Sequence, residues 1–478
     1  MWEKPTVEFL LYVTLAASLL APVTSPLGRR ENKAPVIMAG VGVGSFIALA
    51  AVLLYAASST TLKFYGGLVV QDSFTSLILL GIALAAAIYM VAIGSDGLSW
   101  SSSPSLYSLI PLTLFGSFFL AGAANLLVIL ASWLLVSVIS YVVVAASDAK
   151  EAKGAAVRYI FVGIVATLAL VGSLAFYSVA TGTYSLQLSA LTHASPVARG
   201  IVAISVILLL AALGFKVGLF PFHWWLPSVY GRGDGRTISF VASVIKLSFI
   251  AVLARVFVVS SYGSPLANDV ALTLAILSVA SMTYANVAAL TTRDLQAILA
   301  YSSMAQVGYI MAALAAAAYF AGAMRYDMVR LALYAVAIQS IGYALAKAPL
   351  FAFTGAVSRE LERLRGLMGA SPASAVAASV LLFSLLGVPP LLGFWGKFYL
   401  FLSTVGYTVW LALAALINSG VSAVYYIIAS RELLSKTSEP GPRAPLKSSI
   451  ALVVGSLLVL LLGLVAPLIY GSIVTVYI

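Results

Sequence analysis

Long runs of apolar residues recur along the whole chain, and charged residues fall almost entirely between them. Most runs are close to 20 residues long, which is the length a helix needs to cross the hydrocarbon core of a bilayer. The pattern therefore predicts an all-α polytopic membrane protein with about fourteen transmembrane helices. The predicted spans are residues 6–24, 35–57, 73–94, 106–123, 125–146, 156–180, 199–218, 238–259, 268–290, 297–320, 329–355, 373–402, 408–430 and 448–475.

Two of these spans are interrupted by proline. The seventh meets Pro221 shortly after Lys216, and the twelfth contains Pro389 and Pro390 shortly before Lys397. Proline removes a backbone donor, and a broken helix at membrane depth is tolerated only where protein or a water-filled cavity surrounds it. A lysine beside each break therefore indicates a functional site, although a lysine reaching towards the membrane surface beside an ordinary kink is the alternative.

The two broken spans are five spans apart, and five is odd, so units built around them would enter the membrane from opposite sides. This is the arrangement of inverted repeats whose broken helices meet near the midplane. We predict two inverted five-helix repeats with helices 7 and 12 broken. The predicted segments are residues 1–105 (helices 1–3), 106–260 (helices 4–8), 261–432 (helices 9–13) and 433–478 (helix 14).

The basic residues outside the spans are unequally divided between the two sides of the membrane. One set of alternate loops holds sixteen of them, namely Arg29, Arg30, Lys33, Lys150, Lys153, Arg158, Arg232, Arg236, Arg293, Arg359, Arg363, Arg365, Arg431, Lys436, Arg443 and Lys447. The opposite side holds five, namely Lys4, Lys63, Arg199, Arg325 and Arg330. Because cytoplasmic loops are enriched in Lys and Arg, both termini are expected to face away from the cytoplasm of a prokaryotic cell.

Composition narrows the chemistry that the chain itself can perform. Hydrophobic residues make up 62% of the chain and charged residues 9%, and there are no cysteines and only two histidines. Disulfides, iron–sulfur clusters and thiolate chemistry are excluded, and no haem or metal site is expected. We predict no cofactor and no redox centre in this chain. The net charge of +11 is explained by the loops, so the expected partner is the lipid bilayer and not nucleic acid.

Lysines inside the spans are the candidate functional residues. Lys216, Lys246 and Lys397 lie too deep for an easy escape to the membrane surface, whereas Arg255, near a span end, is expected to be structural or interfacial. Removal from water disfavours the charged form of an amine and lowers its pKa. A buried lysine whose pKa lies near the working pH can take up and release a proton. Several such groups joined by water and hydroxyls form a proton relay. The expected helper side chains are Ser239, Ser243, Ser248, Tyr301, Ser302, Ser303, Gln306, Gln339, Ser340 and Tyr343.

Two further residues have two readings each. His223 either links Lys216 to Lys246 or holds the broken backbone of the seventh span. Lys347, two residues before Pro349, either joins the relay or is structural. We include both among the candidate relay residues.

Four stretches of the chain resemble, in order, the antiporter-like membrane subunits of respiratory complex I, which are related to Mrp-type antiporters and membrane-bound hydrogenases. The stretches are GFKVGLFPFHWWLP, SVIKLSFIAVLARVF, LQAILAYSSMAQVGYIMAAL and SLLGVPPLLGFWGKFYLF. The resemblance covers spans four to thirteen. It implies fourteen helices, inverted repeats, proton translocation and further antiporter-like subunits as partners. It also implies that Lys216, Lys246 and Lys397 are the family's lysines of helices seven, eight and twelve.

Subunit N is the best match among the related subunits, because the sequence stops at Ile478 without the lateral helix of subunit L. The segment AKAPLFAFTGAV around Lys347 is more similar to subunits L and M and to the Mrp and hydrogenase members, so these assignments stay open. One departure concerns the family's glutamate of helix five. The matching segment is NLLVILASWLLVSVISY, in which Leu134 takes the place of that acid.

The loss of one partner from a buried ion pair costs about 3–5 kcal/mol. Either Lys216 is therefore neutral at rest, or an acid from a neighbouring subunit serves it, or this copy does not pump. The expected function is a proton-translocating membrane subunit of a complex I-like oxidoreductase of the NADH/quinone or ferredoxin type. The alternatives are a subunit of an Mrp-type cation/proton antiporter or energy-converting hydrogenase, and a non-pumping structural subunit.

Overall fold

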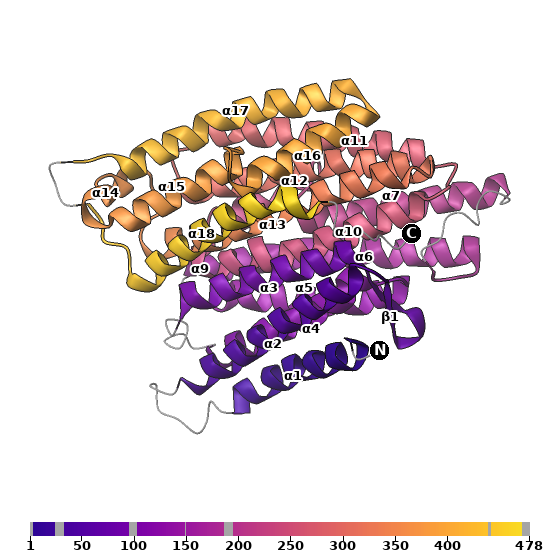
Figure 1. Ribbon diagram of the computed structural model, residues 1–478, viewed down its shortest axis with the longest axis horizontal. Coiled ribbons are helices and arrows are strands. Elements are labelled where there is room, and N and C mark those ends of the chain that lie inside the picture. Colours follow the sequence, from indigo (N-terminus) through magenta and orange to yellow (C-terminus); the bar gives the residue numbers. More distant parts are fainter. Residues whose placement is uncertain are drawn as a thin grey trace.

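The computed structural model describes residues 3–23, 33–94, 103–148, 150–185, 195–437 and 441–470, and almost all of them are helical (Figure 1). Within these residues twelve helices are long and apolar enough to cross a membrane. They are α1 (Glu3–Val23), α2 (Ala34–Ala57), α3 (Ser73–Ile93), α5 (Leu126–Ala145), α6 (Lys150–Thr181), α7 (Pro196–Val217), the continuous segment Gly235–Ser261, α11 (Ala267–Leu290), α12 (Leu295–Gly322), α13 (Tyr326–Ala356), α17 (Val409–Leu434) and α18 (Leu446–Ile469).

Two spans are shorter or broken. α4 covers Ser103–Gly122, and the twelfth span is the pair α15 (Pro372–Leu386) and α16 (Leu392–Tyr407). Together with the twelve long helices they correspond to the fourteen predicted spans, so the predicted polytopic all-α fold is confirmed. The sixth span was predicted too short, because α6 begins at Lys150 and carries its polar first turns beyond the apolar run.

The remaining elements are short and lie between the spans. They are β1 (Leu62–Phe64), η1 (Tyr65–Gly67), β2 (Val69–Gln71), α8 (Trp225–Tyr230), η5 (Glu362–Leu364) and α14 (Leu367–Ala370). The segment Gly235–Ser261 divides into α9 (Gly235–Phe240), the π-helical turn η4 (Val241–Ile245) and α10 (Lys246–Ser261). The antiparallel pair β1 and β2 places Lys63 opposite Val70.

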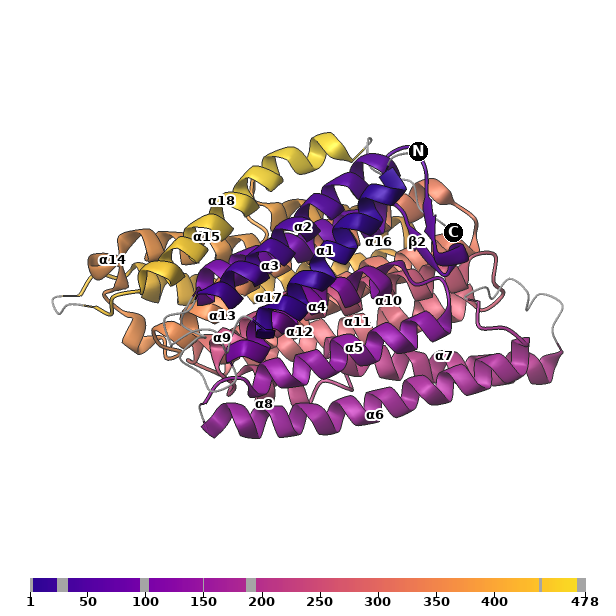
Figure 2. The same ribbon diagram turned by 90° about the horizontal axis from the view of Figure 1, so that it is seen from below.

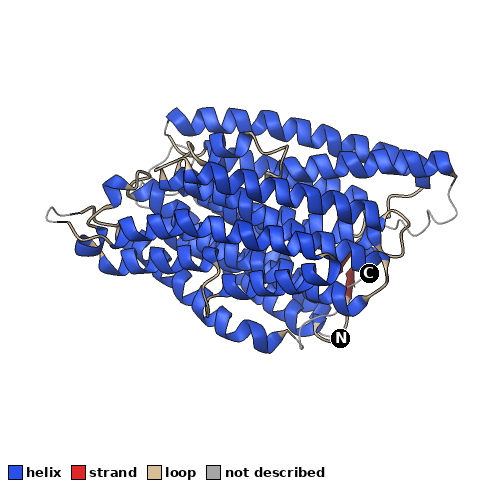
Figure 3. Cartoon of the chain, turned by 90° about the horizontal axis from the view of Figure 1, so that it is seen from above, coloured by secondary structure: helices blue, strands red, loops and turns tan. Residues whose placement is uncertain are grey.

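The helices run side by side along the long axis of the molecule, with α1 and α17 at opposite sides of the view in Figure 1. α10, α12 and α13 form the centre, where almost every residue is buried, whereas α1 and α18 expose most of their apolar surface. Figure 2 shows α6 along an outer edge, and Figure 3 shows how little of the chain is not helical. Helices that are apolar all round are typical of membrane spans, and the exposed ones face lipid or other subunits.

One end of the bundle is fixed by a buried ion pair. Arg255 of α10 lies 3.0 Å from the carboxylate of Asp72 and donates two further hydrogen bonds to the carbonyl oxygens of Val70 and Ala121. Asp72 also accepts the backbone N–H of Thr75 and so caps α3. These contacts confirm the prediction that Arg255 is structural, and they fix α10, which carries Lys246, against the β-hairpin.

Ion pairs at the other end join loops that the charge pattern had placed on one side. Arg359 contacts Glu151 at 3.4 Å and Asp294 at 3.4 Å, which brings the start of α6, the start of α12 and the end of α13 together. Arg365 contacts Glu432 at 2.6 Å. Arg29 and Arg30 lie outside the described residues. For the described loops, these pairs agree with the predicted alternation along the chain.

Both breaks begin at a glycine in the left-handed conformation. α7 ends at Gly218, with φ of 76°, and α15 ends at Gly387, with φ of 95°. Residues with side chains rarely adopt this conformation, whereas glycine adopts it readily and commonly ends helices. The prolines follow within three residues, and the peptide bonds Phe220–Pro221 and Pro389–Pro390 are cis. The two predicted breaks are therefore present at the predicted residues.

Candidate functional site

Four lysines are buried inside the bundle: Lys216 in α7, Lys246 in α10, Lys347 in α13 and Lys397 in α16. None is more than 3% exposed. Two of them lie at the breaks. Lys216 is in the last turn of α7, where the free backbone carbonyls of a helix end favour a cation. Lys397 lies just after the second break and faces the carbonyl end of α15.

Lys216 lies among aromatic rings. Its Nζ donates a hydrogen bond of 3.1 Å to the hydroxyl of Tyr141. The same Nζ lies 4.6 Å from the ring centroid of Tyr141, 5.0 Å from that of Phe249, 5.4 Å from that of Tyr159 and 5.7 Å from that of Trp133. No carboxylate of the described residues lies within ion-pair distance of this amine. The charge is therefore faced by the rings of α5, α6 and α10 and by one hydroxyl.

The match of Leu134 to the acid of the related subunits stays a prediction, but the structure shows which residue of α5 lies beside Lys216. Leu134 is 43% exposed on the outside of α5, and the residue that faces Lys216 is its neighbour Trp133, which is fully buried. Adjacent residues of a helix point about 100° apart, so the two neighbours have different surroundings.

Rings also separate Lys216 from Lys246. Tyr159, beside Lys216, stacks on Trp225 with centroids 4.9 Å apart, and Trp225 meets Tyr230 edge-on at 5.8 Å. Tyr230 in turn lies 5.1 Å from the Nζ of Lys246. α8, which follows the break after α7, supplies the middle of this row.

Lys246 follows the π-helical turn η4, a distortion that often marks functional sites. Its Nζ finds no hydrogen-bond acceptor among the described residues and lies between the rings of Tyr230 and Tyr343. The serines expected to assist it do not contact it. Ser239 and Ser243 donate to backbone carbonyls, and Ser248 pairs with Ser117 of α4. Ser239 joins α9 to α13 and Ser248 joins α10 to α4, whereas the hydrogen bond of Ser243 stays within its own segment.

Lys347 is completely buried and has two partners on α12. Its Nζ donates to the carbonyl oxygen of Leu299 at 2.7 Å and to the hydroxyl of Ser302 at 2.7 Å. The Tyr343 ring lies 5.8 Å from the Nζ of Lys246 and 6.0 Å from that of Lys347. The fold therefore brings these two lysines together around one tyrosine.

A buried polar network continues from Lys347. The hydroxyl of Ser302 shares a hydrogen bond with Tyr426 of α17, and Tyr426 also accepts one from the Gln306 amide at 3.3 Å. Gln306 in turn accepts a hydrogen bond from Gln339 of α13. α12, α13 and α17 thus share one chain of hydroxyl and amide groups. Tyr426 was not among the predicted residues, because a tyrosine in an apolar span carries no sequence signal of its direction.

Lys397 has its own surroundings. Its Nζ donates to the carbonyl oxygen of Leu386 at 2.8 Å, at the end of α15, and to the hydroxyl of Ser419 at 2.9 Å. The amine also lies 4.8 Å from the ring centroid of Tyr309. The Tyr309 hydroxyl accepts a hydrogen bond from the Asn286 amide at 3.2 Å. Ser419, Tyr309 and Asn286 are further residues that the sequence did not single out.

His223 lines a polar cavity of about 600 Å³ between α8, the end of α11 and the start of α12. Its ring stacks on Phe220, with centroids 5.3 Å apart, and meets Tyr284 edge-on at 4.4 Å. These contacts agree with the structural reading of His223. The ring is buried, and its ring contacts within the described residues are with Phe220 and Tyr284 and not with Lys216 or Lys246. Asp294 and Arg359 line the same cavity. Burial raises the pKa of Asp294 above its ordinary value, and this outweighs the Ala297 N–H and the Arg359 guanidinium, which lower it.

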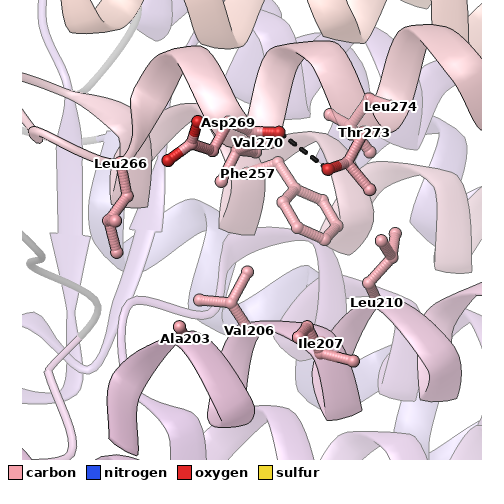
Figure 4. A pocket seen from close by; sticks show the side chains of 10 residues that line it. All are labelled: Ala203, Val206, Ile207, Leu210, Phe257, Leu266, Asp269, Val270, Thr273 and Leu274. Atoms are coloured by element: carbon pink, nitrogen blue, oxygen red, sulfur yellow. Dashed lines mark hydrogen bonds between the residues drawn. The ribbon is translucent and has the colours of Figure 1, made fainter. Parts of the chain in front are cut away.

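A second, apolar groove of about 180 Å³ lies between α7 and α11 (Figure 4). It holds one carboxylate, that of Asp269, and one hydroxyl, that of Thr273, which donates to the backbone carbonyl of Asp269 at 2.7 Å. The other lining side chains are apolar. The groove therefore offers no row of polar groups, and the polar chemistry of the chain is concentrated around the four lysines.

The described residues contain no group of three or more His, Cys, Asp or Glu side chains that could hold a metal ion. What the arrangement offers chemically is a series of buried amines, hydroxyls and amides that can exchange protons.

Residues 123–422, more than half of the chain, match the family described as NADH:quinone oxidoreductase/Mrp antiporter, transmembrane. NADH-quinone oxidoreductase subunit 14 of Thermus thermophilus is 31% identical over 477 residues, which cover 97% of this chain and 98% of that protein. NADH-quinone oxidoreductase subunit N 2 of Solidesulfovibrio magneticus is 33% identical over 379 residues, 77% of each chain.

The fold is similar to that of a solved relative as well. A chain of respiratory complex I from Thermus thermophilus with bound aureothin superposes with a TM-score of 0.78 at 27% identity, covering 97% of this chain and 98% of that one. The match spans the breaks at Pro221 and Pro389–Pro390, so the resemblance inferred from the four sequence stretches is confirmed. The chain is a multi-pass membrane protein and belongs to the NADH:quinone oxidoreductase/Mrp antiporter transmembrane family.

Proposed function

We propose that this chain is a proton-translocating membrane subunit of a complex I-like oxidoreductase, with Lys216, Lys246, Lys347 and Lys397 as its proton-exchanging groups. The single observation that carries the proposal is the burial of four amines in one bundle, two of them at helix breaks. A charge at membrane depth is costly and occurs mainly where it serves transport. The redox step belongs to other polypeptides, and no cofactor is assigned to this chain.

The contacts support a path through the centre of the bundle. Lys246 and Lys347 share the Tyr343 ring, and Lys347 continues through Ser302 to Tyr426. Lys216 lies at one side of this path. Hydroxyl groups can donate and accept at once, so they can pass a proton between amines when a small movement or a water molecule closes the remaining gaps.

We also propose the arrangement of the chain in the membrane. Residues 106–260 and 261–432 form two inverted repeats, supported by the matched glycine and proline breaks after α7 and α15. The loops rich in Lys and Arg face the cytoplasm of a prokaryotic cell, and both termini face the opposite side. Further membrane subunits, including other antiporter-like ones, are the expected partners, because the relatives named above are subunits of larger oxidoreductases.

Replacement of Lys397 by alanine tests the proposal. The purified complex that contains this chain is reconstituted into vesicles, and the protons moved per electron are measured with a pH-sensitive dye. We expect fewer protons per electron in Lys397→Ala, because its contacts to Ser419 and Leu386 have no substitute. Lys436→Ala, in an exposed loop, is the matched control and should pump normally. An unchanged ratio in Lys397→Ala would contradict the proposal.

A non-pumping structural subunit is the second candidate, and one observation favours it: no described carboxylate pairs with Lys216. If this reading holds, Lys216→Ala and Lys397→Ala both pump like the unaltered chain while assembly of the complex stays intact. An Mrp-type antiporter or an energy-converting hydrogenase has the same membrane fold in the resemblance. The subunits that co-purify with the chain distinguish these assemblies from a quinone-linked one.

A further inference from the structure

Lys216 has an unusual partner set for a buried cation, since aromatic rings surround its amine and no carboxylate of the described residues lies within ion-pair distance. The rings come from three helices: Trp133 and Tyr141 from α5, Tyr159 from α6 and Phe249 from α10. We call these four side chains the aromatic cage. We propose that the aromatic cage holds the protonated form of Lys216 in place of a carboxylate partner. This inference rests on the proposed function and deepens it.

The physical basis is the quadrupole of an aromatic ring. Each ring face carries partial negative charge and attracts a cation within about 6 Å of its centroid, more strongly where water is excluded. All four centroids lie within 5.7 Å of the Nζ, and the lysine is 3% exposed. Because the rings approach from three helices, the attraction does not depend on a single contact.

The cage is built rigidly. The indole N–H of Trp133 donates to the hydroxyl of Thr167 at 3.2 Å, and its ring meets Phe249 edge-on at 4.9 Å. Tyr159 meets Tyr141 edge-on at 5.0 Å. Rings fixed in this way need no reorganisation when the amine gains its charge, and such preorganised groups stabilise charge best.

A ring differs from a carboxylate in one respect that matters for a relay. A carboxylate can take the proton itself, whereas a ring face can attract the ammonium but cannot accept its proton. The hydrogen-bond acceptor at Lys216 among the described residues is the Tyr141 hydroxyl, 3.1 Å from the Nζ. In this chain Trp133 is therefore a positioning residue that acts through Lys216, and transfer to and from the amine goes through Tyr141.

The test compares the isosteric pair glutamate and glutamine at position 133 in the reconstituted complex, with protons per electron as the readout. We expect Trp133→Glu to keep at least half of the pumping that Lys216→Gln removes, because a carboxylate then faces the amine. Trp133→Gln, equal in size but neutral, should fall to the level of Lys216→Gln. Trp133→Phe should stay above Trp133→Leu, since only phenylalanine keeps a ring face. Leu134→Ala, on the outer face of α5, is the control and should pump normally.

Double variants separate a role through Lys216 from a loss of packing. Adding Trp133→Gln to Lys216→Gln should cause no further loss, because both changes remove the same interaction. Equal pumping by Trp133→Glu and Trp133→Gln, or a further additive loss in the double variant, would overturn the cage. If instead Lys216→Gln itself pumps normally, the relay role of Lys216 in the proposed function fails. If the leucine variant does not assemble, the glutamate and glutamine pair still decides.

Discussion

Replacing Arg255 with methionine tests how much the buried ion pair at the hairpin end contributes to the stability of the bundle. The arginine is 4% exposed, and its guanidinium bonds the Asp72 carboxylate and the carbonyls of Val70 and Ala121, all at 3.0 Å. Methionine fills similar space but leaves Asp72, 2% exposed, without this cation. Breaking a buried pair from one side costs about 3–5 kcal/mol, and we expect a loss of free energy of unfolding in this range.

The loss is measured by reversible unfolding in mixed micelles, with the folded fraction followed as the denaturing detergent is increased. The double variant Asp72→Asn, Arg255→Met should recover part of the stability, because asparagine caps a helix as well as aspartate does and carries no charge. A remaining loss of about 1–3 kcal/mol is expected from the two carbonyls left without a donor. The matched control is Arg325→Met, whose pair with Asp327 is well exposed, and its effect should stay below about 1 kcal/mol.

Two results would refute this reasoning. If Arg255→Met unfolds within about 1 kcal/mol of the unaltered chain, the pair contributes no more than an exposed one. If Asp72→Asn makes the arginine variant worse instead of better, the loss of the Arg255 charge beside the Asp72 carboxylate is not the source of the loss.

Three further predictions concern the centre and one loop. Gly396→Ala would place a Cβ 2.7 Å from the Cα of Gln339, so α16 must move from α13, and we expect a loss of about 1–3 kcal/mol in thermal unfolding together with weaker pumping. Tyr426→Phe removes the hydroxyl bonded to Ser302, a buried bond of about 1–1.5 kcal/mol, so proton transfer measured in vesicles should slow by about tenfold. Burial raises the pKa of Asp234, but hydrogen bonds from neighbouring side chains outweigh this and hold its pKa below the ordinary 3.8. Asp234→Asn should therefore lower the melting temperature at neutral pH and have a shrinking effect as the pH falls below about 3.8.

Controls follow from the same structure. Gly369→Ala meets no atom within 4 Å and should leave stability unchanged, so an equal loss there would contradict the clash at Gly396. Tyr55→Phe alters an exposed hydroxyl far from the lysines along the chain, and a slowing equal to that of Tyr426→Phe would rule out a specific link. For Asp234→Asn, the same destabilisation at acid and neutral pH would show that the carboxylate charge is not what stabilises the loop.

The spans could be predicted from the sequence because the bilayer requires each one to be about 20 residues long and mostly apolar. Lys216 and Lys397 stand out for the same reason, since a charge inside an apolar run is costly wherever its side chain points. Prolines mark the breaks directly, because their chemistry removes a backbone donor. The charges of the loops predicted that the loops of Glu151 and Arg359 lie on the same side of the membrane. In the structure these two residues, 208 positions apart, are in contact.

The partners of the lysines were decided only by the tertiary structure. α5 is apolar on every side, so its sequence does not indicate whether Trp133 or Leu134 faces inwards, and only the packing of the helices placed the Trp133 ring beside Lys216. Tyr426 and Ser419 lie in α17, on a different helix from Lys347 of α13 and Lys397 of α16, and tyrosines and serines are common in spans. The length of an apolar segment and the free-energy cost of a charge inside it are properties of that segment alone, so the sequence of the segment reveals them. Which face of a helix meets an amine depends on how several helices pack together, because a rotation of one residue exchanges interior for lipid.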